Sequence, residues 1–174
     1  MDPILRVEGL KGAFVLNTYK GSPADRAGLL PGDYVLRADG QSIRNADHLT
    51  QVVGAMVAGR TYQFELVRYG ERQSFSVKIG EQEDKEEVAL YRNLWPGMTV
   101  VKITDEIRKE AGIDRGVEGV VIGYIPDENT PSAIAGFRPG DVITEINGRP
   151  VRTMMDFFRG INDRSKKDVT FRIN

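Results

Sequence analysis

The sequence is poor in the residues on which most enzyme and metal sites depend. Its 174 residues contain no cysteine and only one histidine, His48. The absence of cysteine excludes a disulfide scaffold, a thiol nucleophile and thiolate zinc ligands. One histidine among scattered carboxylates gives no metal-ligand spacing. We therefore expect neither a metal site nor any other cofactor.

The sequence also lacks long apolar runs and an excess of either charge. No stretch approaches the roughly 18 apolar residues of a membrane span, and no basic segment leads into an apolar one at the start. Lys and Arg number 24 against 25 Asp and Glu. This balance argues against a nucleic-acid partner, which would favour excess positive charge. Hydrophobic residues at 40% and charged residues at 28% indicate an ordinary globular protein.

Glycine is abundant, and much of it belongs to an internal repeat. The chain has 19 glycines and 8 prolines, which favours many short strands and turns over long helices. Residues 22–43 recur at 130–151, 108 positions later, around the shared sequence features Pro, Ala-Gly and Pro-Gly-Asp. A repeat of this length indicates a duplicated domain and not a solenoid. The chain is therefore expected to hold two copies of one small fold.

Both copies predict the same order of elements. An apolar strand is followed by a short helix, a Pro-Gly-Asp turn, a second strand, a hairpin turn, a longer helix and a closing strand. Asp39-Gly40 and Asn147-Gly148 are strong hairpin dipeptides. The predicted elements are 14–16, 23–27, 34–38, 46–56 and 62–66 in the first copy, and 120–122, 131–135, 142–146, 154–161 and 169–173 in the second.

This order of elements, with the repeated block, resembles the PDZ domain. Lys11-Gly12-Ala13-Phe14-Val15 ahead of the first block is similar to the tandem modules in the C-terminal half of HtrA/DegP-family serine proteases. The resemblance implies an α+β, mainly β fold. Each of its two PDZ-like modules would be a small, partly open β-barrel or sandwich capped by two helices.

The resemblance also sets the expected domain limits and the context. We expect the first module at 1–82, a charged linker at 83–90 and the second module at 91–174. The first would lack its N-terminal strand and carboxylate-binding loop, and the second its last strand. The resemblance implies a longer, homo-oligomeric parent with a protease domain, located in the periplasm or cell envelope.

The chain itself offers no convincing catalytic centre. A serine protease needs a nucleophile, a base and an oxyanion hole, but neither Gly-x-Ser-x-Gly nor Gly-Asn-Ser-Gly-Gly occurs. His48 lies on a predicted helix, and Asp33 and Asp141 follow Pro-Gly, where Asp accepts local backbone N–H groups. We expect no enzymatic activity here, although the suspected parent is a serine endopeptidase. Two alternatives are peptide hydrolysis by the chain itself and the PDZ pair of a membrane-embedded metalloprotease or stand-alone scaffold.

Peptide binding is the function that the resemblance implies. PDZ domains take a peptide C-terminus or an unfolded extended segment as an added β-strand, while loop amides hold the terminal carboxylate. The matching loop and strand lie in the second copy, opposite two helix residues four positions apart. The predicted peptide-binding residues are Trp95, Pro96, Gly97, Met98, Thr99, Val100, Met154 and Phe158.

Two further expectations concern this predicted site. Pro96 has no N–H, which leaves Gly97 and Met98 as donors and predicts weakened carboxylate affinity or a preference for internal segments. Phe157 and Ile161 are expected to face the core, while an apolar pocket would select a hydrophobic C-terminal side chain. The alternative is that all four helix residues belong to the core.

Overall fold

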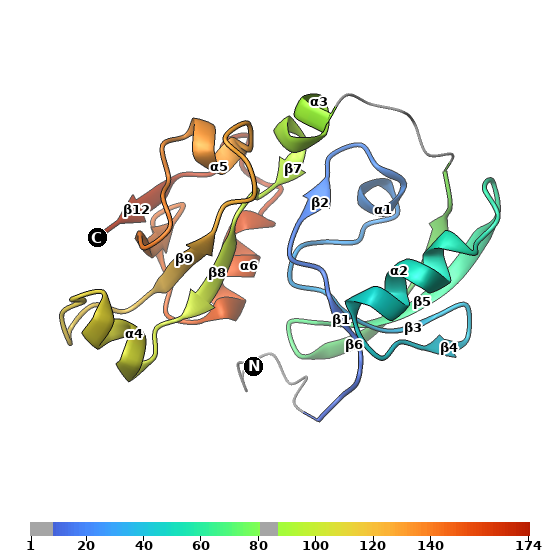
Figure 1. Cartoon of the computed structure of the whole chain (residues 1–174), viewed down its shortest axis with the longest axis horizontal. Coiled ribbons are helices and arrows are strands. Elements are labelled where there is room, and N and C mark those ends of the chain that lie inside the picture. Colours follow the sequence, from blue (N-terminus) through green and yellow to red (C-terminus); the bar gives the residue numbers. More distant parts are fainter. Residues whose placement is uncertain (1–8, 81–86) are drawn as a thin grey trace.

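The computed structural model describes residues 9–80 and 87–174, which form two modules side by side (Figure 1). Residues 9–80 belong to the first module and residues 87–174 to the second. Each has an open, mainly antiparallel sheet, and neither sheet closes into a barrel within the described ranges. The expected α+β, mainly β fold is confirmed.

The first module has one five-stranded sheet and two helices. The strand order is β1-β3-β5-β6, with β4 paired to β3. Its elements are β1 (Ala13–Phe14), β2 (Thr18–Tyr19), α1 (Pro23–Arg26), β3 (Tyr34–Ala38), β4 (Gln41–Ser42), α2 (Ala46–Gly54), β5 (Thr61–Arg68) and β6 (Glu71–Lys78).

The second module repeats most of this plan and has two strands and two helices before it. The sheet order is β11-β10-β9-β8, with β12 paired to β10. Its elements are α3 (Glu87–Arg92), β7 (Leu94–Trp95), β8 (Thr99–Lys102), α4 (Asp105–Glu110), β9 (Val120–Tyr124), α5 (Pro131–Ile134), β10 (Val142–Ile146), β11 (Arg149–Pro150), α6 (Met154–Ile161) and β12 (Phe171–Ile173).

Local sequence explains where these elements begin and turn. The Thr153 hydroxyl accepts the Asp156 N–H, and the Asp156 carboxylate accepts the Thr153 N–H, so a capping box starts α6 at the predicted residue. Thr130 is the N-cap of α5, and its hydroxyl accepts the Ala133 N–H. Asp39 and Asn147 have φ values of 50° and 52°, as expected of the first residue in a tight hairpin turn.

The duplication extends to strand register. Ala13 pairs with Val35 in the first sheet, and Val120 pairs with Ile143 in the second. Val35 and Ile143 are 108 residues apart, which is the offset of the repeat, and Ala13 and Val120 are 107 residues apart. The two modules are therefore copies in structure as well as in sequence.

One of the two hydrophobic cores spans both modules. The first module has its own cluster around Val35, Ile43 and Leu66. The other cluster combines Tyr34, Leu36 and Val67 of the first module with the interior of the second. A two-stranded sheet formed by β2 and β7 also joins the modules.

The segment between the modules differs in part from the expected linker. Residues 81–86 lie outside the described part of the chain, whereas residues 87–90 of the expected range 83–90 belong to α3. The helix continues to Arg92 and leads directly into β7. Among the described residues, no helix is long and apolar enough to cross a membrane.

Candidate functional site

The predicted carboxylate loop connects β7 to β8 at the contact between the modules. Gly97 has a φ of +76°, and a Cβ there would stand 2.7 Å from the Thr130 Cβ, so only glycine fits. The Trp95 indole N–H donates to the Ile161 carbonyl oxygen at 3.2 Å, and the Ser132 hydroxyl donates to the Pro96 carbonyl. The loop is thereby fixed to the end of α6 and to α5.

The Gly97 amide already has an acceptor from the other module. Its N–H donates to Asn17 Oδ1 at an N···O distance of 2.8 Å. Gly97 is one of the two donors that the sequence leaves for a ligand carboxylate. Its N–H therefore points to a position where an acceptor oxygen fits.

A cavity of about 390 Å³ opens beside this loop. Trp95, Pro96 and Met98 form one part of its wall. The remaining lining includes apolar side chains of the second module and residues of the first, namely Phe137, Ile161, Phe171, Thr18, Lys20, Leu30 and Pro31. Charged residues that follow α6 complete it, namely Asp163, Arg164, Lys166, Lys167 and Asp168. Such a hollow can accept a hydrophobic side chain.

Phe137 and Phe171 line the cavity, although the sequence did not point to them as candidates for the site. Their rings pack edge to face with centroids 5.1 Å apart on one side of the cavity. Phe137 corresponds in the repeat to Leu29, which is a buried core residue of the first module. The correspondence with Leu29 indicates a core position for Phe137. No local sequence pattern indicates that Phe137 lines a cavity.

Strand β8 continues from the loop and lies at the end of its sheet. It pairs with β9 through Thr99 and Val100, and no other described strand pairs with its opposite edge. Val100 is buried and Thr99 is half-buried. An unpaired strand edge presents the backbone donors and acceptors that β-augmentation requires.

The structure does not bring Met154 and Phe158 into the cavity. Phe158 is only 2% exposed and stacks on Phe14 of the first module, with ring centroids 6.0 Å apart. Met154 is partly buried and packs at the border of the shared core. Phe157 and Ile161 are core residues, as expected. A role for Met154 and Phe158 in peptide binding stays a prediction.

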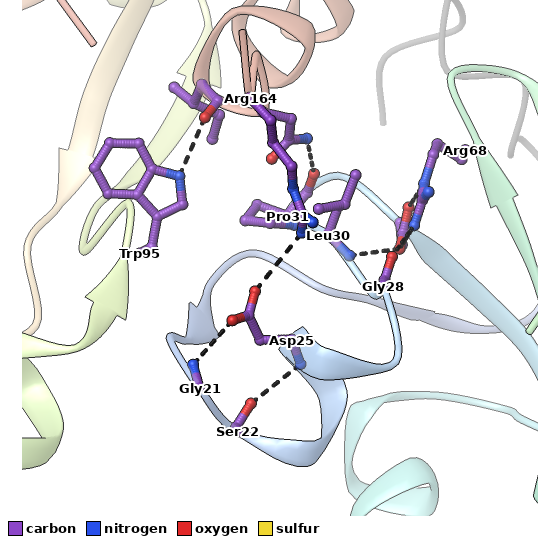
Figure 2. Close-up of polar contacts among 12 residues, drawn as sticks. Gly21, Ser22, Asp25, Gly28, Leu30, Pro31, Arg68, Trp95 and Arg164 are labelled. Atoms are coloured by element: carbon purple, nitrogen blue, oxygen red, sulfur yellow. Dashed lines mark hydrogen bonds and ion pairs between the residues drawn. The ribbon is translucent and has the colours of Figure 1, made fainter. Parts of the chain in front are cut away.

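Polar contacts hold the Pro31 turn of the first module against the end of α6. The Asn162 side-chain amide donates to the Pro31 carbonyl and to the Tyr69 hydroxyl, each at 2.9 Å. Figure 2 shows Trp95 and Arg164 of the second module facing Pro31 and Asp25 of the first. The Arg164 guanidinium lies 3.9 Å from the Asp25 carboxylate, and the Lys20 ammonium lies 5.5 Å from the Trp95 ring centroid.

A second hollow of about 750 Å³ lies in the first module. Its walls are mainly apolar and come from α2 and from strands β3, β5 and β6. They include Val15, Leu49, Val53, Met56, Phe64 and Ile79. This hollow is a competing place for an apolar ligand, so any binding experiment must distinguish the two.

The residues considered for catalysis have structural partners. His48 Nδ1 accepts the Arg44 backbone N–H at 3.2 Å. Asp33 and Asp141 accept the N–H groups of Leu30 and Arg138, each at 2.8 Å, as predicted for the two turns. Within the described ranges, no group of three or more His, Cys, Asp or Glu residues could hold a metal ion.

Comparison with known proteins places this fold in a family. Two family profiles match, both described as the PDZ domain, at residues 4–79 and 126–172. A "Probable periplasmic serine endoprotease DegP-like" of Pseudomonas fulva (strain 12-X) is 33% identical over 155 residues, which are 84% of this chain and 31% of that protein. A protein of the same name from Hahella chejuensis (strain KCTC 2396) is 34% identical over 155 residues, covering 84% and 32%.

Among solved structures, "HtrA-type protease AlgW with decapeptide" is 26% identical, with a TM-score of 0.40 over 41% of this chain and 22% of that one. The chain spans about a third of the length of the curated relatives that it matches. Both matched profiles are PDZ domains, and the relatives are named as serine endoproteases. The chain therefore belongs to the PDZ domain family, as a tandem pair homologous to the PDZ region of HtrA/DegP-like serine endoproteases.

Proposed function

We propose that this tandem pair is the substrate-recognition and regulatory region of an HtrA/DegP-like serine endopeptidase of the periplasm or cell envelope. It binds hydrophobic peptide C-termini or extended unfolded segments by β-augmentation. Its other partner is the protease domain of a homo-oligomeric parent. The periplasmic naming of the relatives supports the location, and their naming as endoproteases supports the protease partner.

The observation that carries this proposal is the direction of the Gly97 N–H. It meets an acceptor oxygen at 2.8 Å, beside a partly apolar cavity and just before edge strand β8. A terminal carboxylate oxygen could take the same place, with the last side chain in the cavity between Trp95 and Phe137. Preceding peptide residues would then pair with β8 through their backbone, which is largely independent of sequence.

The chemistry of the cavity predicts which ligands are preferred. Its walls combine apolar side chains, among them Met98, Ile161 and two phenylalanines, with the charged residues Lys20, Asp163, Arg164, Lys166, Lys167 and Asp168. A last side chain that fills the apolar part of the cavity should therefore add to the affinity. Selectivity should therefore reside mainly in the last side chain.

The test is a titration of the whole chain with fluorescent ten-residue peptides that differ only in the last residue. We expect a peptide ending in Val with a free carboxylate to bind on the order of tenfold more tightly than its Gly-ended twin, which corresponds to about 1.4 kcal/mol of binding free energy. A twin with an amidated C-terminus measures how much the terminal carboxylate contributes to the affinity. Equal affinity for the Val-ended and Gly-ended peptides would contradict the proposal.

A further inference from the structure

We infer that the first module closes the peptide site of the second, and that Asn17 takes the place of the ligand's terminal carboxylate. The inference rests on the proposed function, because it concerns regulation of the same site. It goes beyond that function by assigning the first module a role as an internal competitor.

A segment of the first module that begins at Asn17 already bonds to the loop between β7 and β8 and to β7. The Asn17 side-chain oxygen accepts the Gly97 N–H at 2.8 Å, and Thr18 and Tyr19 then pair with Trp95 and Leu94 in an antiparallel ladder. The next backbone N–H, of Lys20, donates to the Asn93 carbonyl at 2.8 Å. An extended segment of the chain therefore already satisfies the loop with backbone bonds and one acceptor oxygen.

This segment and its neighbours in the first module also form part of the cavity wall. Thr18 and Lys20 line the cavity beside Trp95, together with Leu30 and Pro31 of the same module. An incoming peptide must share or clear this entrance before its last side chain can enter. The contact between the modules is thus part of the binding equilibrium.

The two modules pack tightly against each other at Gly32 and Phe158. A Cβ on Gly32 would stand 2.6 Å from Cγ of Phe158, so the modules meet there without room for one more carbon. Gly140 is the equivalent residue of the second copy and has nothing within 4 Å of the same position. Their φ values are +95° and +96°, so backbone geometry is the same and only the neighbour differs.

Together these features predict competition. A neutral amide oxygen is a weaker acceptor than a carboxylate, so a peptide C-terminus can displace Asn17. Only the open fraction of molecules can bind, and the apparent affinity falls by that fraction. Changes that separate the modules should therefore strengthen binding, and changes that tighten their contact should weaken it.

The main experiment compares Gly32→Ala with its matched control Gly140→Ala in the whole chain. Both substitutions place a Cβ at the same positive φ, but only Gly32→Ala meets Phe158. We expect Gly32→Ala to raise the affinity for the Val-ended peptide by about tenfold. It should also change the emission of Trp95, the single tryptophan, in the absence of peptide. Gly140→Ala should leave both quantities near their wild-type values.

A second pair of variants tests the acceptor without adding bulk. Asn17→Asp places a carboxylate opposite the Gly97 N–H and should lower peptide affinity several-fold, because a charge-assisted bond strengthens closure. Asn17→Ala removes the acceptor and should raise the affinity. These opposite signs at one position are not expected from a loss of folding alone. The pair also serves if Gly32→Ala does not fold.

The outcomes separate this inference from the function on which it rests. If wild type, Gly32→Ala and both Asn17 variants bind the peptide equally, the proposed function stands and the closure is overturned. If Trp95 emission changes in Gly32→Ala but no variant binds the peptide, the proposed function fails and the inference fails with it. Opposite affinity changes in the two Asn17 variants would support both.

Discussion

Asp33 and Arg68 form a buried ion pair beneath the Pro-Gly turn of the first module. Arg68 Nε lies 2.7 Å from Asp33 Oδ1, and the Asp33 side chain is fully buried. The guanidinium also donates to the Gly28 carbonyl and lies 4.7 Å from the Phe75 ring centroid. This pair fixes the turn that carries Pro31 and Gly32 to the second module.

Removal of the guanidinium should be costly because it would leave a buried carboxylate without its counter-charge. We predict that Arg68→Met lowers the free energy of unfolding by about 3–5 kcal/mol. Urea denaturation followed by circular dichroism measures this change. Arg172→Met is the matched control, since Arg172 is 70% exposed in its pair with Glu145. The control should cost less than about 1 kcal/mol. Equal losses in the two variants would contradict the assignment.

Gly12 allows β1 to lie close to β3. A Cβ there would stand 2.5 Å from the Val35 carbonyl oxygen and 2.6 Å from the Tyr34 ring. We predict that Gly12→Ala costs about 1–3 kcal/mol of folding stability because the strands must move apart. Gly116→Ala, which meets nothing within 4 Å, is the control for the added methyl group. Thermal melts of the two variants should differ clearly, and coincident melts would refute the close approach.

Tyr69, which bonds to Asn162 across the contact between the modules, should make folding stability depend on pH in the alkaline range. Burial raises the pKa of the Tyr69 phenol above its ordinary value, and the hydrogen bond from Asn162 opposes part of that rise. The folded protein then holds this proton more tightly than the unfolded chain. Its contribution is complete below the ordinary tyrosine pKa of about 10 and is lost as the pH rises through the higher folded value.

We therefore predict that Tyr69→Phe reduces the loss of stability as the pH rises above about 10. The measurement is urea denaturation at several pH values for wild type and variant. Tyr124→Phe, at a 60% exposed site, is the matched control for loss of a phenol. Parallel pH curves for wild type and Tyr69→Phe would show that this phenol does not contribute.

The elements that the sequence predicted well depend on local chemistry. Strands 34–38 and 142–146 and helix 154–161 have the predicted limits, because turn dipeptides and a capping box mark them. Hydrophobic periodicity also identified Phe157 as a core residue. These features require only neighbours in the sequence or on one helix face.

The features that escaped prediction depend on how the modules pack. The β2–β7 pairing and the Asn17–Gly97 hydrogen bond join residues about 80 positions apart. Helical spacing separates Phe158 from Phe157 beside it, but it does not indicate that Phe158 meets the other module. The repeat does show one relevant difference, because Phe14 stands where the second copy has the smaller Val121. The larger Phe14 ring stacks on Phe158 of the other module. The consequence of this difference became visible only with both modules in place.

The most direct test of the account is an amide chemical-shift map of the whole isotope-labelled chain with the Val-ended peptide. If the loop between β7 and β8 binds the peptide, the largest shifts will fall on Gly97 and Met98, with accompanying shifts at Asn17 as it is displaced. The same titration with the Gly-ended twin should give much smaller changes. Shifts centred instead on Leu49, Val53 and Met56, around the hollow of the first module, would contradict the assignment of the site.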